Sequence, residues 1–164
     1  MTHPLVEEVM KKAAIAWVTV DGGPAYGVWC LGLDGALYVV SGPGEQPAPG
    51  LATADAALVT ARGDHGGHIV SWPVTVQRVF PGTDEWDSVA VQLAGKRLNA
   101  PGTADALVAR WAAECAISRL TPAGPDVRAG AALPDESGAT PPRPTPAARP
   151  TRRPFRLHRV RRPR

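Results

Sequence analysis

The sequence predicts an α+β fold: a small antiparallel β-barrel of about six strands, flanked by helices and followed by a disordered C-terminal tail. Apolar runs at 14–20, 24–33 and 36–41 are divided by turn sequences, and the runs are apolar on both faces. A sheet with one solvated face would alternate apolar and polar residues. We therefore expect both faces of these strands to be covered, by helices around a closed barrel or by a second subunit.

The first elements are a helix and a meander of strands. Pro4–Ala13 is expected to be a short helix, because proline is tolerated in a first turn and the acidic residues precede the lysines. The pairs Asp21-Gly22 and Asp34-Gly35 supply the positive φ angles of tight hairpin turns. They predict a three-strand antiparallel meander, Ala14–Val20, Pro24–Leu33 and Ala36–Ser41.

The later elements complete one domain over residues 1–125. Ser41–Gly50 contains three prolines and three glycines, which predicts a loop, and Leu51–Asp55 is expected to form one helical turn. Patterning then predicts strands at Ala56–Arg62 and His68–Val79, helices at Thr83–Leu98 and Thr103–Cys115, and a last strand at Ala116–Leu120. This order is typical of an α+β domain built on a small barrel.

Charge separates this domain from the rest of the chain. Residues 1–125 carry 8 Lys/Arg against 12 Asp/Glu, whereas residues 126–164 carry 10 Arg against 3 acids. The tail is rich in proline and arginine, which predicts disorder. It either attracts nucleic acid through its charge or is simply solvated, and we favour the solvated interpretation.

The remaining composition predicts a cytoplasmic protein. The N-terminal segment carries four charges and has no signal-peptide core, and no apolar run is long enough to cross a membrane. Cys30 and Cys115 lie among apolar neighbours, so both are expected to be small buried hydrophobes.

The segments AIAWVTVDGGPAYGVW, GALYVVSGPGEQPAPGL, AALVTARG and HIVSWPVTVQRV resemble the pyridoxamine 5′-phosphate oxidase-like family, the FMN-binding split β-barrels. The resemblance covers roughly residues 5–121 and lies in layout and spacing. It implies a homodimer with FMN, or in some branches a deazaflavin or haem, between the subunits. It also implies an oxidoreductase acting on a small-molecule substrate, in which the cofactor carries the hydride chemistry.

The same resemblance implies where a flavin phosphate would lie. In flavin-binding members an arginine on the second strand and a Ser-x-Lys-type pair after the third hold the phosphate. Tyr26 stands near the arginine position and Gln46 near the lysine position, and the loop offers Ser41, Gly42 and Gly44 but no cation. Two missing charge-assisted contacts, at about 1.5–3 kcal/mol each, weaken phosphate binding by orders of magnitude. Backbone amides, or Lys96 and Arg97 from a partner subunit, are the possible substitutes.

Several other residues have both a ligand-binding and a simpler structural interpretation. Trp72 and Trp86 are the tryptophans to inspect for stacking on a flavin ring, although core or interface packing is favoured for most tryptophans. Lys96 and Arg97 also suit a helix C-terminus without any ligand. The segment Asp64–His68, DHGGH, is interpreted as a hairpin loop at the barrel rim rather than a metal site.

Three functional hypotheses follow. The first is a flavin-dependent split-barrel oxidoreductase whose catalytic residues the sequence does not identify. The second is a non-catalytic split-barrel binding protein with a degenerate cofactor site, supported by Tyr26 and Gln46 at the cation positions. The third is a nucleic-acid-associated protein acting through the basic tail.

Overall fold

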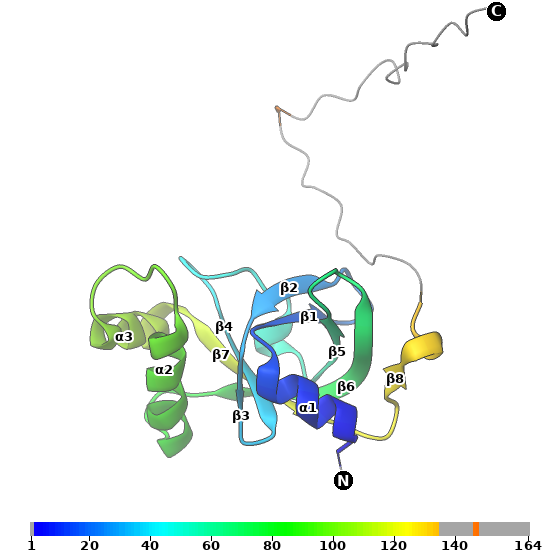
Figure 1. Ribbon diagram of the computed structural model, residues 1–164. Helices are drawn as coiled ribbons and strands as arrows, with labels where there is room; N and C mark the ends of the chain where they lie inside the picture. The colour runs from blue at the N-terminus through cyan, green and yellow to red at the C-terminus, as the bar shows by residue number, and fades with distance from the viewer. Residues whose placement is uncertain (1, 135–145, 148–164) are drawn as a thin grey trace, which may run out of the picture.

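The computed structural model describes residues 2–134 and 146–147. It contains α-helices, β-strands and short 3₁₀ helices in the order expected for an α+β domain (Figure 1). The helices are α1 (Pro4–Lys12), α2 (Asp84–Lys96) and α3 (Ala104–Glu114), with 3₁₀ turns η1 (Leu51–Thr53) and η2 (Gly130–Ala132). The strands are β1 (Ile15–Thr19), β2 (Tyr26–Trp29), β3 (Leu31–Leu33), β4 (Ala36–Ser41), β5 (Ala56–Arg62), β6 (His68–Val79), β7 (Ala116–Pro122) and β8 (Arg128–Ala129).

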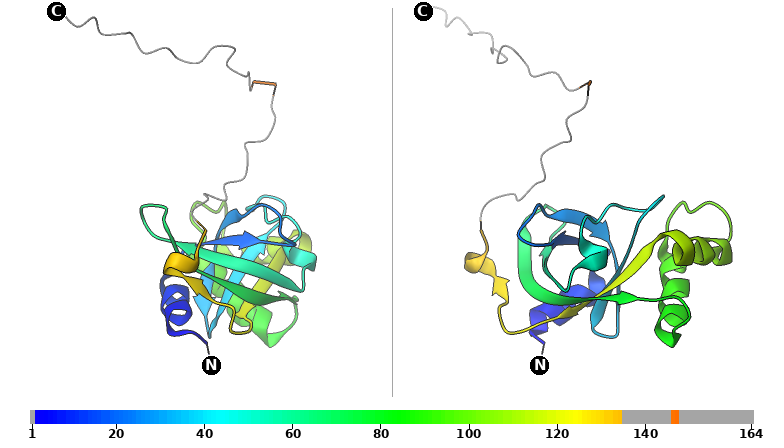
Figure 2. Two further views of the ribbon diagram at one scale, coloured as in Figure 1. Left: turned by 90° about the vertical axis from the view of Figure 1, so that its right-hand side faces the viewer. Right: turned by 180° about the vertical axis from the view of Figure 1, so that it is seen from behind.

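The strands form a nearly closed antiparallel barrel. Seven of them follow one another in the order β2-β1-β5-β6-β7-β4-β3, and β8 pairs with β6 off this path. Helix α1 lies against the barrel, whereas α2 and α3 lie together on the far side of β4 and β7 (Figures 1 and 2). The predicted bounds of β4, β5 and β6 are confirmed, and Thr83 and Thr103 cap α2 and α3 through their side chains.

The predicted strand 24–33 is wrong in one respect, because the chain divides it at Cys30. Its first half, β2, pairs with β1, and its second half, β3, pairs with β4. The Cys30 N–H instead donates to the Ala14 carbonyl at 3.0 Å. The three strands therefore form two hairpins at opposite ends of the strand path rather than one meander. Both Asp-Gly turns have the expected positive φ angles at Asp21-Gly22 and Asp34-Gly35.

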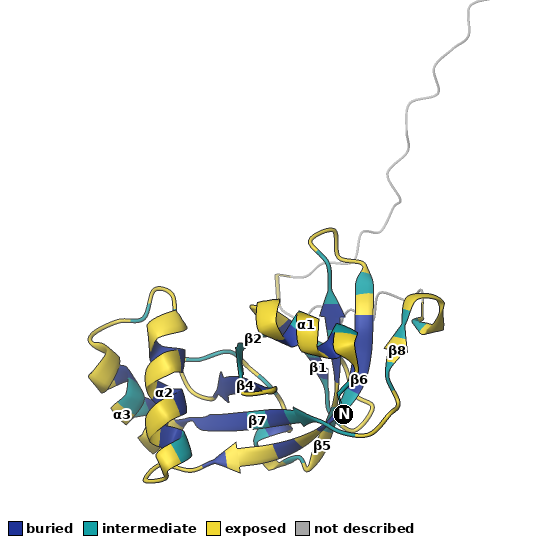
Figure 3. Ribbon diagram, turned by 60° about the horizontal axis from the view of Figure 1, so that its bottom comes forward, coloured by how far each residue is buried: buried dark blue, intermediate teal, exposed yellow. Residues whose placement is uncertain are grey.

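Two hydrophobic cores share β4, which is buried along its whole length (Figure 3). Leu37 and Val39 face the barrel interior, and Tyr38 and Val40 face α2 and α3. The expectation that both faces are covered therefore holds for β4. In β1 buried and more exposed residues alternate and Ile15 is 60% exposed, so coverage of its outer face by a second subunit stays a prediction.

Gly32 is the point at which α1 meets β3. A Cβ added at Gly32 would lie 2.1 Å from the Met10 carbonyl oxygen, so no side chain fits without moving the helix. We expect Gly32→Ala to lower the free energy of unfolding by about 2 kcal/mol through overpacking. Gly95→Ala in α2 is the matched control, since nothing lies within 4 Å of its Cβ position, and it should be neutral or stabilising. Urea denaturation of both variants measures the difference, and equal stabilities would contradict the prediction.

Ordered structure continues past the predicted domain boundary at residue 125. β8 pairs with β6 through Val70↔Ala129 and Ser71↔Arg128, and η2 follows it. The arginine-rich end of the tail, and with it the nucleic-acid hypothesis, lies outside the described residues. Within the described residues, no helix has the length and apolar character needed to cross a membrane.

Candidate functional site

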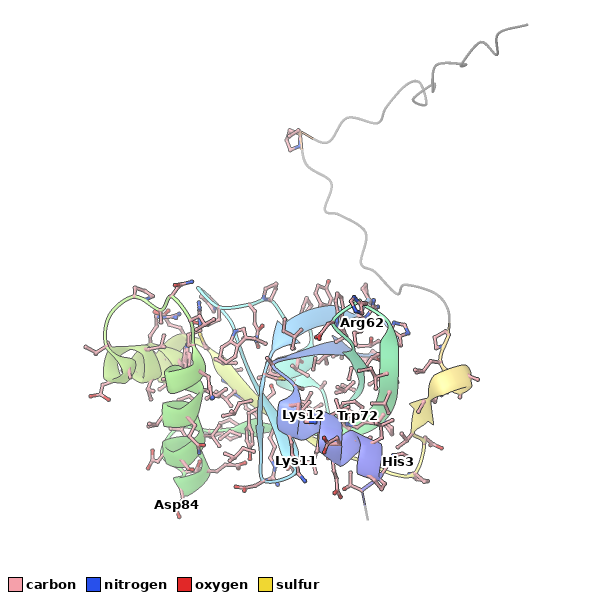
Figure 4. The ribbon with its side chains drawn as sticks, viewed as in Figure 1. His3, Lys11, Lys12, Arg62, Trp72 and Asp84 are labelled. Carbon is pink, nitrogen blue, oxygen red and sulfur yellow. The ribbon has the colours of Figure 1, made fainter. Side chains whose placement is uncertain are left out.

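A basic cleft lies where the C-terminal ends of α1 and α2 approach the β2–β3 junction. We call it the lysine cleft, because its lining includes Lys11, Lys12 and Lys96, which are all the lysines of the chain. Figure 4 shows Lys11 and Lys12 at one end of α1, with His3 at its other end. The volume of the cleft is about 640 Å³, and its other lining residues are Ala13, Ala14, Ile15, Trp29, Cys30, Leu31, Gly32, Arg97 and Leu98.

The cleft combines positive charge with an apolar wall. The three lysines are exposed, and Trp29 and Leu31 are half-buried beside them. Among the residues that the structure describes, no acidic residue lines the cleft, although Lys12 forms an exposed ion pair with Glu8 one turn earlier on α1. Such a surface suits a flat, conjugated ligand that carries anionic groups.

The loop after β4 contains a buried ionic network centred on Glu45. The Glu45 side chain is 0% exposed, and its carboxylate accepts hydrogen bonds from Arg97 Nε at 2.8 Å, Trp111 Nε1 at 3.0 Å and Arg110 Nη2. Burial by itself would raise the pKa of Glu45, but these hydrogen bonds outweigh it and lower the pKa below its ordinary value. Arg110 Nη1 also donates to the Pro43 carbonyl at 2.7 Å. The network fastens the loop to α2 and α3.

Gln46, the next residue, is bound to backbone on the opposite side. Its Oε1 accepts from the Trp29 N–H at 2.7 Å, and its Nε2 donates to the carbonyls of Trp29 at 2.8 Å and Val40 at 3.1 Å. The Gln46 amide thus takes the place of a neighbouring strand for the backbone of Trp29, where β2 ends before Cys30. The amide that stands near the family's lysine position therefore holds β2 and β4 together.

Ser41 and Gly42 line a second cleft at the rim of the barrel, with a volume of about 560 Å³. Arg78 of β6 also lines this rim cleft, and its Nη2 donates to the Cys115 carbonyl at 3.4 Å. Gly42 has φ of 139°, and a Cβ there would lie 3.0 Å from the Cys115 Cα. In the described part of the chain, the lining of the rim cleft thus includes one cation, Arg78, together with the carboxylate-bearing residues Glu45 and Glu114.

The other predicted site residues lie apart from the lysine cleft. Tyr26 packs half-buried against the barrel core, Trp72 is inside that core, and Trp86 is inside the core beneath α2. Gly44 has φ of 74°, and a Cβ there would lie 2.9 Å from Arg110 Nη1, so this glycine admits the arginine to the loop. Lys96 and Arg97 are the two predicted residues that the structure places in the lysine cleft. Among the residues that the structure describes, no group of three or more potential ligands could hold a metal.

Both cysteines are buried free thiols, as the sequence predicts. Burial raises the pKa of Cys30 to about 12, and it raises the pKa of Cys115 as well. Because the thiolate is the reactive form, we expect neither cysteine to react with Ellman's reagent in the native protein at pH 8 and both to react in denaturant. Rapid release of one equivalent of chromophore from the native protein would contradict this.

Comparison with known proteins defines the fold class. No protein-family model and no curated protein matches the chain. Among solved structures, the heme storage protein HutZ from Vibrio cholerae matches with a TM-score of 0.57 and 16% identity over 77% of this chain and 93% of HutZ. A candidate pyridoxamine 5′-phosphate oxidase from Listeria innocua matches with a TM-score of 0.51 and 10% identity, over 74% and 92% of the two chains. The protein Rv2991 from Mycobacterium tuberculosis also has a TM-score of 0.51, with 16% identity over 78% and 83%.

These matches, together with the divided barrel, show that the chain has the split-barrel fold of pyridoxamine 5′-phosphate oxidase-like proteins. At such low identities the likeness shows the fold alone.

Two parts of the site were missed by sequence reasoning. Glu45 was not singled out, although it is the only charged residue between Asp34 and Asp55 and lies among glycines and prolines. Lys11 and Lys12 were interpreted only as charges that suit a helix C-terminus. Their proximity to Lys96 depends on how α1 and α2 pack around β3, which the local pattern does not contain.

Proposed function

We propose that this chain binds a planar, anionic redox cofactor of the flavin class in the lysine cleft and acts as a split-barrel oxidoreductase. The observation that carries the proposal is the meeting of all three lysines around a cleft walled by Trp29 and Leu31. FMN is the leading candidate cofactor, with a deazaflavin or haem as alternatives. All three pair a flat conjugated system with anionic groups, which is the combination that the cleft fits.

The loop after β4 fits such a cofactor less well. The guanidinium groups of Arg97 and Arg110 already donate to the buried carboxylate of Glu45. The Gln46 amide already donates to the Trp29 carbonyl. An anionic group placed beside Glu45 would lose the benefit of those cations and meet a like charge. The described lining of the lysine cleft holds three lysines and no acid, so we assign the anionic groups of the cofactor to Lys11, Lys12 and Lys96.

The residues of the cleft divide into two roles. The lysines would hold the anionic groups and orient the ligand, and Ile15, Trp29 and Leu31 would exclude water from one face of its ring system. When bound, a cofactor of this class supplies hydride or electron transfer, and the protein supplies position and electrostatics.

We also propose a homodimer that covers the outer face of β1, β5 and β6. Ile15, Leu58 and Ile69 are 60%, 39% and 38% exposed on these strands. A second copy placed there would cover these exposed apolar side chains. Light scattering during gel filtration tests this proposal: a dimer is expected, and a monomer at micromolar concentration would contradict it.

The cofactor proposal is tested by the absorption spectrum of the purified protein, followed by titration with FMN, a deazaflavin and haem. Saturable binding of one of them, with the protein stabilised against heat by that compound, is the expected result. A colourless protein that binds none of the three would overturn the proposal and favour the non-catalytic alternative.

A further inference from the structure

We propose that Glu45 and Gln46 are positioning residues that together set the separation between opposite walls of the lysine cleft. The inference rests on the proposed function for its ligand, but the contacts that carry it belong to the protein alone. Neither residue lines the lysine cleft, and Glu45 lines the rim cleft instead, so we do not expect either side chain to touch a ligand in the lysine cleft. They act through the residues that they hold.

Gln46 fixes the wall formed by β2. Its amide binds both the N–H and the carbonyl of Trp29 and also reaches the Val40 carbonyl. Trp29 lines the cleft at the end of β2, where it lies opposite Ile15 of β1, and its own N–H and carbonyl bind the Gln46 amide. Replacing the amide would leave the Trp29 backbone groups without these partners.

Glu45 fixes the wall formed by the end of α2. Its carboxylate accepts from Arg97 Nε, and Arg97 and Lys96 are adjacent lining residues of the cleft. Arg97 also ends α2, where its N–H donates to the carbonyls of Leu93 and Ala94. Holding Arg97 therefore holds the end of the helix that carries Lys96.

The α1–β1 junction forms a third wall of the cleft, and it is tied to the β2 wall. The Cys30 N–H donates to the Ala14 carbonyl, which joins the α1–β1 junction to the residue after Trp29. Residues 29 and 30 thus link the β2 wall to the α1–β1 junction and to Gln46. The consecutive side chains of Glu45 and Gln46 connect the β2 wall with the α2 wall. A change at either residue should alter ligand affinity without touching the ligand.

The test compares Gln46→Ala and Glu45→Gln with Gln92→Ala, which changes an exposed glutamine of α2 whose amide donates to Ser88 one turn earlier. Two quantities are measured in the full chain: amide hydrogen exchange at Trp29, and the dissociation constant for FMN. In Gln46→Ala we expect exchange at Trp29 to accelerate at least about tenfold, from the loss of its hydrogen bonds to Gln46, and the dissociation constant to rise about tenfold. Glu45→Gln should raise the dissociation constant but leave Trp29 protected, and Gln92→Ala should change neither.

The outcomes separate this inference from the proposed function. Unchanged exchange at Trp29 in Gln46→Ala would overturn the inference, as would acceleration at every amide of the barrel, which indicates global destabilisation only. Exchange that accelerates at Trp29 with FMN affinity unchanged would overturn it too. If the wild type binds no FMN, titration with haem and a deazaflavin replaces that arm. If none of the three binds, the proposed function fails, and the positioning inference then stands or falls on the local acceleration at Trp29.

Discussion

Replacing Glu45 with alanine is expected to lower the free energy of unfolding by about 3 kcal/mol, the low end for breaking a buried ion pair. The carboxylate is fully buried and accepts from Arg97, Arg110 and the Trp111 indole, so its removal leaves three donors without their acceptor. The low end applies because the two arginine side chains are 25% and 29% exposed, and water can compensate part of the loss. Equilibrium denaturation in urea measures the change.

Glu85→Ala is the matched control for this prediction. Glu85 also contacts an arginine, Arg119, at 3.4 Å and accepts from the Tyr38 hydroxyl, but its side chain is 38% exposed. Exposed pairs contribute little, so its loss should cost at most about 1 kcal/mol. A smaller effect at Glu45 than at Glu85 would show that the loop after β4 is not fastened as described.

The same carboxylate should give the protein part of its acid sensitivity. Its pKa is lowered in the folded state from the ordinary value of 4.5, so the stabilisation is present above the unfolded-state pKa and is lost as the pH falls through the folded-state value. We expect the wild type to lose stability relative to Glu45→Gln as the pH falls from about 5 toward 2. Denaturation curves across that range test this, and parallel stability profiles for the two proteins would contradict it.

Local sequence signals were sufficient for most of the fold. The pairs Asp21-Gly22 and Asp34-Gly35 adopt the positive φ angles that predicted the turns, and the threonines at 83 and 103 cap the helices that follow them. The division of residues 24–33 was not predictable in the same way. Cys30 is an apolar residue in an apolar run, and the strand ends there because β2 and β3 pair with different partners.

The candidate site was less accessible to sequence reasoning, for two physical reasons. The lysine cleft joins the ends of two helices that are far apart in the chain, so only the tertiary packing brings Lys12 near Lys96. The family resemblance predicts a phosphate site in the loop after β4, where Gln46 stands near the position of an expected cation. In this chain a glutamine amide there completes backbone hydrogen bonding, and an adjacent glutamate supplies charge of the opposite sign.

Removing charge from the lysine cleft is expected to have the largest effect on cofactor binding. Each charge-assisted contact to an anionic group contributes about 1.5–3 kcal/mol, so Lys11→Ala combined with Lys96→Ala should raise the dissociation constant for FMN at least about 100-fold. The folded structure should survive, because both side chains are exposed and neither forms a salt bridge among the described residues. Titration at low and high salt measures the constants, and the salt dependence should weaken in the double variant.

Arg78→Ala is the control that decides between the two clefts. Arg78 is the cation of the rim cleft beside Ser41 and Gly42, where the family resemblance implies a flavin phosphate, and it does not line the lysine cleft. If the lysines hold the anionic groups, Arg78→Ala should leave the dissociation constant within about twofold of the wild type, since it removes only a distant, screened charge. A loss of FMN binding in Arg78→Ala with little change in the double lysine variant would move the cofactor to the rim of the barrel. The lysines would then be solvated charges at two helix C-termini, as their sequence context alone suggests.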